Sequence, residues 1–281
     1  MKKFRVGTCS WNYESWLGLV YSFKWKTSAP YLVEYSKHYK TAEIDSWFYN
    51  LPEPDEVKEY KENVPKDFTF TLKVPRELTM THIPLPGGIT SNSHFLSMEF
   101  FEVFYSRIEE LLPQVTGIIF QFPYFENDKI SSLSQFLFRA KSFFPNLPKE
   151  LPIGIEVRNK DFLNDNYFDF LTENNIIPVL SEMKMLPTIT ETYEKNKLRI
   201  GDNIIIRLLG GDRKEIELRT KKMWDEIRLP KMQNQAIAEM IVEMLETKNV
   251  ILNVNNHYEG SAPKTIQAIL EFMKQAGYKE K

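Results

Sequence analysis

The sequence is poor in the residues that build disulfides and zinc sites. Its 281 residues include one cysteine, Cys9, and four histidines, and none of the histidines stands in the H-x-H or H-E-x-x-H spacing of metal enzymes. A single cysteine cannot form an internal disulfide, and it fits a reducing compartment. The sequence therefore argues against a disulfide framework, a cysteine-based zinc cluster and a histidine-rich metal centre.

Long apolar runs are also missing. No segment approaches the roughly 18 consecutive apolar residues that a transmembrane helix needs. After the basic start, MKK, the first apolar run is only as long as a strand, which is shorter than the apolar core of a signal peptide. These observations predict a soluble, cytoplasmic protein with no membrane partner.

The net charge is small. Lys and Arg number 36 and Asp and Glu number 38, which gives a formal net charge of -2. A protein with this balance has no overall field that would attract nucleic acid or an anionic membrane. The most charged stretch, residues 212–228, mixes both signs and is typical of a solvated helix face. Nucleic acid is therefore a disfavoured partner.

Strand-like and helix-like segments alternate along the chain. Short apolar runs bounded by polar or turn residues predict eight strands, at residues 4–10, 41–48, 68–74, 115–122, 152–158, 176–181, 203–209 and 249–255. Apolar residues at helical spacing predict helices between most of them, for example at 97–112, 131–144 and 235–248. Eight strand–helix repeats in a chain of this length match the (β/α)8 barrel, which typically has about 250 residues.

A doubly wound open sheet is the competing architecture. Its phosphate-binding fingerprint, G-x-G-x-x-G, would follow the first strand, but the turn there reads GTCSWNY. No Ser/Gly-rich linker divides the chain. We therefore predict an α/β fold, a TIM-type (β/α)8 barrel forming a single domain over residues 1–281. Residues 81–94, rich in proline and glycine, predict a long loop on the face where barrel enzymes keep their lids.

Polar side chains recur at the carboxyl ends of the predicted strands. In a β/α barrel these ends surround one mouth, so residues far apart in the sequence converge there. The polar residues concerned are Glu43, Asp45, Ser46, Tyr49, Lys73, Arg76, Gln121, Glu156, Arg158, Arg207, Asn253, Asn255 and Asn256, and the aromatic Phe48 lies among them after the second strand. Together they predict a binding site for a polar ligand at the mouth.

Arg207 lies within a run of five apolar residues. A buried arginine has a desolvation penalty on the order of several kcal/mol unless it is paired, so Arg207 must have an acceptor. Two interpretations stay open: a structural ion network that plugs the barrel, or a ligand site. Charged and amide groups at the ends of at least six strands exceed what a plug needs, and they favour the ligand site.

The chemistry of these side chains narrows the reaction. Arg158, Arg207 and Lys73 can bind a phosphate or carboxylate. Glu43 and Glu156 can act as general acid or base, or as a glycosidase pair if their separation is right. Lys73 can form a Schiff base if its neighbours lower its pKa. No cofactor is identified and no metal site is predicted, although carboxylate-held Mg²⁺ stays open.

Aromatic residues near the mouth suggest a second class of ligand. Trp11 follows the first strand directly, and Phe48 and Tyr49 follow the second. Such rings can stack on bases or sugars, although they more often anchor a core or a loop. They keep a nucleic-acid function open beside the enzyme.

Six motifs carry a resemblance to a known family: VGTCSWNYESWLGLVY, TAEIDSWFYNLPEPDEVKEYKENVPKDFTFTLKVPRELT, GIIFQFP, GIEVRNKDF, IIRLLGG and NVNNHYEGSAP. By these motifs the chain resembles the DUF72, or YecE-like, family of uncharacterised proteins over essentially its whole length. The resemblance implies a TIM-type barrel but no reaction. The family's characteristic positions fall on Trp11, Glu43, Ser46, Phe48, Tyr49, Lys73, Gln121, Pro123, Glu156, Arg158, Arg207, Gly210, Asn255, Asn256, Tyr258 and Gly260. We expect the last strand to deliver Asn255 to the mouth, with Asn256 and Tyr258 shaping the next turn.

The chain also departs from the pattern that it resembles. Many members have glycine where this chain has Ser10, and histidine where it has Asn159 and Leu209. A Thr-His pair of the family falls on Thr79 and Met80, with His82 two residues further on as a substitute. If the family's chemistry uses those histidines, this protein is altered in specificity or inactive.

Three functions from different classes result. The preferred one is an enzyme, a hydrolase, isomerase or lyase, that acts on a small anionic or polyhydroxylated substrate by acid/base chemistry. Its catalytic candidates are Glu43, Glu156 and Lys73, and its substrate-binding candidates are Trp11, Ser46, Phe48, Tyr49, Gln121, Arg158, Arg207, Asn255, Asn256 and Tyr258. The alternatives are a nucleic-acid-binding, endonuclease-IV-like barrel and a ligand-binding barrel without catalysis, which arginine-neutralised glutamates would favour.

Overall fold

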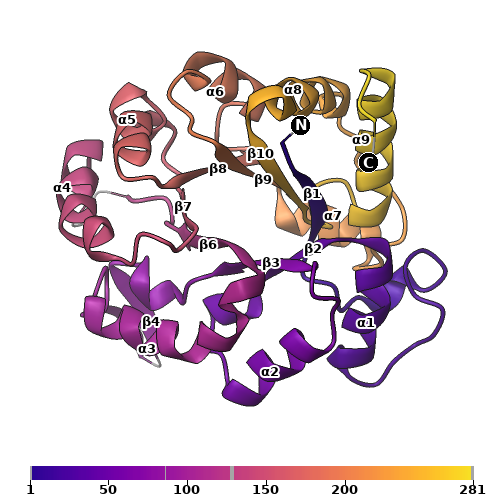
Figure 1. The fold of residues 1–281 in the computed structure, drawn as a ribbon, viewed down its shortest axis with the longest axis horizontal. Coiled ribbons are helices and arrows are strands. Elements are labelled where there is room, and N and C mark those ends of the chain that lie inside the picture. Colours follow the sequence, from indigo (N-terminus) through magenta and orange to yellow (C-terminus); the bar gives the residue numbers. More distant parts are fainter. Residues whose placement is uncertain (1, 86, 127–129, 280–281) are drawn as a thin grey trace.

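Eight parallel strands close into a barrel in the computed structural model, which describes residues 2–85, 87–126 and 130–279 (Figure 1). Neighbours in the sequence are neighbours in the sheet, and the last strand pairs with the first. The barrel strands are β1 (Phe4–Cys9), β2 (Thr41–Ile44), β3 (Thr69–Lys73), β6 (Val115–Gln121), β7 (Ile153–Glu156), β8 (Ile177–Met183), β9 (Asn203–Gly210) and β10 (Asn249–Val254). The predicted TIM-type barrel is confirmed, and each of the eight predicted strands is present.

Helices surround the barrel (Figure 1). They are α1 (Ser28–His38), α2 (Pro54–Glu62), α3 (Met98–Ile108), α4 (Leu133–Phe143), α5 (Asp165–Glu173), α6 (Ile189–Asn196), α7 (Arg213–Thr220), α8 (Asn234–Thr247) and α9 (Ala262–Gln275). Capping residues fix where several of these helices begin. The hydroxyls of Ser97 and Ser132 accept from backbone N–H groups at the starts of α3 and α4. Thr188 and Glu191 form a capping box at the start of α6. In the described part of the chain, no helix is long and apolar enough to cross a bilayer.

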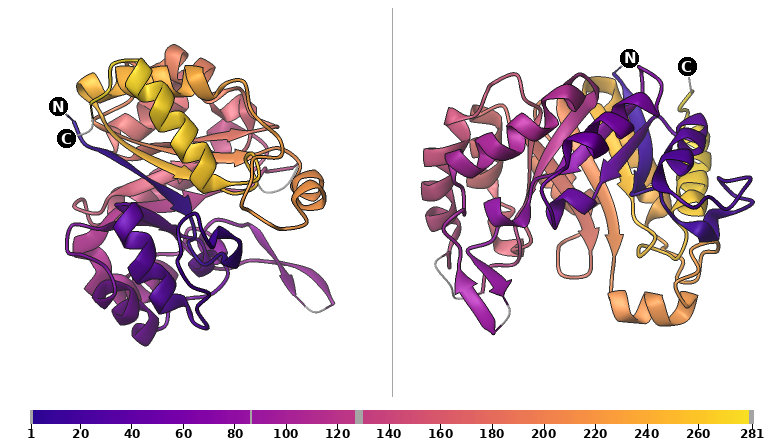
Figure 2. Two further views of the ribbon diagram at one scale, coloured as in Figure 1. Left: turned by 90° about the vertical axis from the view of Figure 1, so that its right-hand side faces the viewer. Right: turned by 90° about the horizontal axis from the view of Figure 1, so that it is seen from below.

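Two segments on the mouth side differ from the sequence-based expectation. Residues 81–94, expected as a long loop, contain an antiparallel hairpin of β4 (His82–Leu85) and β5 (Gly88–Ser91). Of the charged stretch 212–228, only Arg213–Thr220 is helical, as α7. The hairpin and α7 both project from the body of the barrel in the same direction (Figure 2). They project beyond the barrel wall beside the carboxyl ends of the strands, where the predicted site lies.

The register of the strands places polar side chains in one layer of the barrel interior and aliphatic side chains in another. Near the carboxyl ends, Asn253 of β10 pairs with Arg207 of β9, and Gln121 of β6 pairs with Glu156 of β7. Nearer the amino ends, five aliphatic residues form a cluster separate from the main core: Ile119, Ile177, Val179, Ile205 and Ile251. The interior is therefore polar toward the mouth and aliphatic toward the opposite end.

Because β1 and β2 pack closely at Gly7, adding one methyl group there should lower the stability of the protein. A Cβ on Gly7 would lie 1.9 Å from the carbonyl oxygen of Thr41, so Gly7→Ala must push the strands apart. We expect a loss of at least about 2 kcal/mol of unfolding free energy, measured by urea denaturation. Gly201→Ala is the matched control, because a Cβ there meets open space, and it should change stability by less than about 0.5 kcal/mol. Equal stability of the two variants would contradict the register of β1 and β2.

Candidate active site

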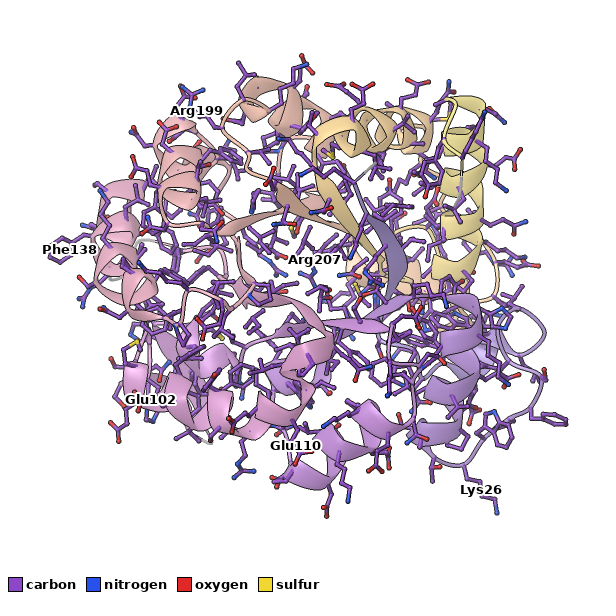
Figure 3. All side chains as sticks on the ribbon, in the orientation of Figure 1. Lys26, Glu102, Glu110, Phe138, Arg199 and Arg207 are labelled. Atoms are coloured by element: carbon purple, nitrogen blue, oxygen red, sulfur yellow. The ribbon has the colours of Figure 1, made fainter. Side chains whose placement is uncertain are left out.

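Arg207 is the centre of the polar layer. It points into the barrel from β9 and only 2% of its side chain is exposed (Figure 3). Its Nε and Nη2 donate to the two oxygens of Glu43, at 2.8 and 2.6 Å, in a bidentate pair. Its Nη1 donates to Glu156 and, at 3.0 Å, to Oε1 of Gln121. The buried guanidinium therefore has the acceptors that its desolvation requires, supplied by β2, β6 and β7.

Asn253 is the remaining hydrogen-bond partner of Glu43. The sequence predicts that Asn255, two positions later, is the residue that reaches the mouth. The amide of Asn253 donates to Oε2 of Glu43 at 3.2 Å and to the hydroxyl of Thr71 at 2.8 Å. In the strand register Asn253 lies directly opposite Arg207, which places its amide beside Glu43. That register depends on how β9 and β10 pair, which a single sequence does not display.

Glu156 is a fixed anion. Burial alone would raise its pKa, but Arg207 and Arg158 outweigh burial and lower the pKa of Glu156 to about 2. Nε of Arg158 lies 3.2 Å from Oε1 of Glu156, while Arg207 binds the other oxygen. Both oxygens therefore face arginines. In this arrangement Glu156 stays ionised through the neutral range, and its fully buried carboxylate faces protein groups and not the solvent.

A second ion pair lies nearer the solvent. Nζ of Lys73, at the end of β3, is 2.5 Å from Oδ1 of Asp45, which follows β2. The same ammonium sits 4.8 Å from the centre of the Phe48 ring, in a cation–π contact. Asp45 keeps 24% of its side chain exposed and Lys73 8%, so the pair forms part of the floor of the mouth.

Glu43 and Asp45 have opposite pKa shifts. Burial raises the pKa of Glu43 above its usual value, and the charge of Asp45 adds to the rise, which Arg207 opposes. Burial also acts to raise the pKa of Asp45, but Lys73 and Arg207 outweigh it and lower that pKa. Two adjacent carboxyl groups whose pKa values are driven apart are suited to hold one proton between them.

Cys9 joins these carboxyl groups, and the trio is the one candidate metal cluster in the described ranges of the chain. The thiol of Cys9 and one oxygen each of Glu43 and Asp45 lie within 4.8 Å of one another. The fit to a cation is poor, however. Burial first, and then Glu43, raise the pKa of the thiol, so it stays protonated, while Arg207 and Lys73 already neutralise the two carboxylates. The same pairing weakens the carboxylate-held Mg²⁺ that the sequence left open.

The predicted site residues fall into two groups. The first gathers at the mouth and consists of Glu43, Ser46, Phe48, Tyr49, Lys73, Gln121, Glu156, Arg158 and Arg207. The second group has structural contacts: the ring of Trp11 is buried against Tyr60 and Phe70, and the hydroxyl of Tyr258 donates to Asn234. In the turn after β10, the side-chain oxygen of Asn255 accepts from the backbone of His257, and that of Asn256 accepts from Ala262.

The structure also shows the surroundings of three positions at which the sequence departs from the pattern that it resembles, namely Ser10, Asn159 and His82. Ser10 has a φ of 64°, in the left-handed region, a conformation that a glycine adopts without a Cβ penalty. Asn159 bonds both the backbone N–H and the carbonyl of Phe125 through its amide, at 2.8 and 3.1 Å. His82 lies on β4, in the projecting hairpin. Asn159 therefore anchors a loop beside the mouth.

Comparison with known proteins places the chain in the DUF72 family. The family model described as "Protein of unknown function DUF72" matches residues 5–280. The protein YecE of Escherichia coli K12 is 27% identical over 158 residues, which cover 56% of this chain and 49% of YecE. The match thus spans about half the length of this curated relative.

Solved structures share the fold. A DUF72 family protein from Enterococcus faecalis has a TM-score of 0.69 at 20% identity, covering 96% of this chain and 95% of that one. Another from Thermotoga maritima has a TM-score of 0.68 at 18% identity, covering 98% and 100%. A protein named SacUVDE aligns with a TM-score of 0.51 at 11% identity, covering 96% of this chain and 98% of that one. At these identities the likeness is one of fold.

The central arginine predicts a large loss of stability on removal. Arg207→Met leaves Glu43 and Glu156 buried without their shared cation, so unfolding free energy should fall by about 3–5 kcal/mol in urea denaturation at pH 7. Arg219→Met removes an arginine from an exposed pair with Glu215 on α7 and serves as the control, with an expected loss below about 1 kcal/mol. A loss in Arg207→Met no larger than in the control would contradict the buried network.

Glu156 predicts a specific pH dependence of stability. Its folded pKa of about 2 is below its usual value of 4.5, so its stabilising effect is full above about pH 4.5 and disappears as pH falls toward 2. The effect amounts to about 3 kcal/mol. Glu156→Gln should therefore flatten the fall in unfolding free energy over this range, measured by urea denaturation at several pH values. Glu102→Gln, at an exposed site on α3 (Figure 3), should keep the wild-type slope, and a wild-type slope in both variants would refute the assignment.

Proposed function

The chain belongs to the DUF72 family of proteins of unknown function, and on that premise we propose that it is an enzyme acting by acid/base chemistry at the barrel mouth. Its substrate is a small anionic or polyhydroxylated molecule. The proton passes between the substrate and Asp45, with Glu43 behind it as the buried partner. Lys73 and Arg158 hold the negative charge of the substrate.

The opposite pKa shifts of Glu43 and Asp45 carry this proposal. An enzyme that moves a proton near neutral pH needs one group that readily gives up a proton and another that readily takes one. Asp45 is the exposed member of the pair and can contact the substrate, whereas Glu43 is fully buried. Glu43 can take up the proton because burial raises its pKa. Asp45 therefore joins Glu43 as a catalytic candidate that the sequence had placed only at the strand end.

The arginines divide into two roles. Arg207 already donates to Glu43, Glu156 and Gln121, so in this proposal it positions the carboxylates and does not bind substrate. Arg158 keeps 31% of its side chain exposed and bonds Glu156 through Nε, so its two outer nitrogens are available to bind an anion. Glu156 accordingly acts as the anchor of Arg158 and Arg207 and not as an acid or base.

Lys73 has two possible roles, and its surroundings favour one. A Schiff-base lysine needs a lowered pKa, which apolar burial or a neighbouring cation would provide. Nζ of Lys73 instead lies 2.5 Å from Oδ1 of Asp45, so the amine is held in an ion pair and is not free to attack a carbonyl group. A charged Lys73 is suited to stabilise negative charge that develops on a substrate oxygen when a neighbouring proton is removed.

Nucleic-acid binding is the second candidate, and one observation favours it. Tyr49 is 57% exposed, and its ring packs edge-to-face on Phe48 beside Lys73. An aromatic surface next to a cation can stack a base and hold a phosphate. The overall charge of -2 weighs against it.

A ligand screen tests the proposal. Purified protein is screened by thermal shift against sugar phosphates, polyhydroxylated acids, nucleotides and short oligonucleotides, and a ligand at 100 times its Kd should raise Tm by roughly 5 °C. A small-anion hit should be lost in Lys73→Met and in Arg158→Met. It should be kept in Lys26→Met, which removes an exposed lysine on the periphery (Figure 3). Stabilisation by oligonucleotides alone would replace the enzyme with the nucleic-acid candidate.

Proton transfer separates an enzyme from a binding protein. Hits are incubated with the enzyme in D2O, and loss of substrate proton signals is followed by NMR. We expect exchange or product formation with the wild type and a loss of at least about 100-fold in Asp45→Asn, which keeps the size of the side chain but removes the base. Binding without exchange or turnover would identify a non-catalytic ligand-binding barrel.

A further inference from the structure

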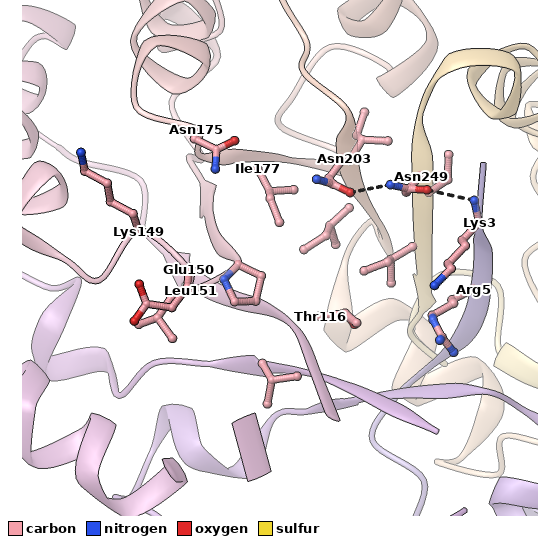
Figure 4. A pocket seen from close by; sticks show the side chains of 16 residues that line it. Lys3, Arg5, Thr116, Lys149, Glu150, Leu151, Asn175, Ile177, Asn203 and Asn249 are labelled. Atoms are coloured by element: carbon pink, nitrogen blue, oxygen red, sulfur yellow. Dashed lines mark hydrogen bonds between the residues drawn. The ribbon is translucent and has the colours of Figure 1, made fainter. Parts of the chain in front are cut away.

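A pocket lies at the end of the barrel opposite the mouth (Figure 4). Its lining comes from the amino ends of β1, β6, β8, β9 and β10 and from residues 149–152 before β7. The cavity has a volume of about 380 Å³, within the range of small-molecule sites. It is separate from the mouth, because the aliphatic and polar layers of the barrel interior lie between them.

The floor of this pocket is aliphatic. Three members of the separate aliphatic cluster line it, namely Ile177, Ile205 and Ile251. Ile177 and Ile251 retain 7% and 9% exposure, although residues of the barrel interior are usually sealed on both sides. The structure thus presents a small apolar surface in a concave site, where a ligand that covers it gains hydrophobic free energy.

The rim of the pocket is cationic. Lys3 and Arg5 stand on one side and Lys149 on another, against a single acidic residue, Glu150 (Figure 4). Within the ranges that the structure describes, none of the three cations lies in ion-pair contact with a carboxylate. Arg5 uses Nη1 on the backbone carbonyls of Lys40 and Asp67, at 3.4 and 3.1 Å. The rim therefore holds positive charge that the protein does not neutralise.

Two of the amide side chains at the rim, those of Asn203 and Asn249, bond to each other and to the start of β1. Nδ2 of Asn249 donates to Oδ1 of Asn203 at 2.9 Å, and Oδ1 of Asn249 accepts from the backbone of Lys3 at 2.9 Å (Figure 4). These bonds fix the start of β1 beside the starts of β9 and β10. They leave the ammonium and guanidinium groups as the cationic partners for a ligand, beside the amide of Asn175 and the carboxylate of Glu150.

From this combination we infer that the pocket is a second binding site, for a small amphiphilic carboxylate such as a medium-chain fatty acid. The aliphatic floor takes the hydrocarbon chain, and Lys3, Arg5 and Lys149 hold the carboxylate at the rim. An inorganic anion would leave the floor uncovered, and a neutral hydrocarbon would leave the cations without a partner. Only a ligand with both parts satisfies both features of the pocket.

The dependence of affinity on chain length is the first test. Butanoate, hexanoate and octanoate are titrated into the full-length protein by isothermal titration calorimetry. If the chain lies on the aliphatic floor, each added methylene should tighten Kd by about fourfold until the pocket is full. Octylammonium, with the same chain and the opposite charge, should bind at least about fivefold more weakly than octanoate. Absent binding, equal affinity for the three acids, or equal affinity for octylammonium would overturn the inference.

Variants locate the site. Lys3→Glu/Lys149→Glu should weaken octanoate binding at least about fivefold, because two attractions become repulsions. Lys26→Glu/Lys214→Glu has the same change in charge at exposed positions elsewhere, and should leave Kd within about twofold. Lys73→Met should also leave it unchanged, and a loss there would move the ligand to the mouth and refute the second site. The outcome does not depend on the enzyme proposal, because no residue of the mouth lines this pocket.

Discussion

The buried guanidinium of Arg207 is the constraint on which the polar half of the barrel depends. An arginine keeps its charge at any physiological pH, so the fold must surround it with acceptors or lose several kcal/mol. Glu43, Gln121 and Glu156 come from three different strands to satisfy it. Their contacts fix those side chains relative to β9. Arg207 thereby holds the groups that face the mouth, and four of its five N–H donors are used within the protein.

The same network explains why neighbouring carboxyl groups behave differently. Glu156 lies between two arginines, so its charge is stabilised and its proton is lost even in acid. Glu43 shares one arginine and has Asp45 beside it, so burial and repulsion prevail and its proton is held more tightly. Asp45 has Lys73 and partial access to water. The second arginine beside Glu156 keeps that carboxylate charged, whereas Glu43, with one arginine and a neighbouring carboxylate, can carry a proton.

Layering makes the two ends of the barrel chemically different. The ion network fills the interior beneath the mouth, while the aliphatic cluster of Ile119, Ile177, Val179, Ile205 and Ile251 fills the other end. At the mouth, ionic groups face solvent and suit a polar ligand. At the opposite end, an apolar floor meets an unneutralised cationic rim and suits an amphiphilic one. A single barrel can therefore offer two sites with unlike ligands.

The sequence by itself determined the eight strands, the barrel, and the need of Arg207 for an acceptor, because apolar periodicity and the penalty of a buried charge are local properties. It also brought Glu43, Lys73, Glu156 and Arg158 to one mouth, since parallel strands in a barrel end at one face. Only the tertiary structure decided that Asn253 binds Glu43 while Asn255 stabilises the turn after β10, that residues 81–94 contain a hairpin, and that a pocket lies at the amino end of the barrel. These depend on register and packing between segments far apart in the chain, which no local pattern records.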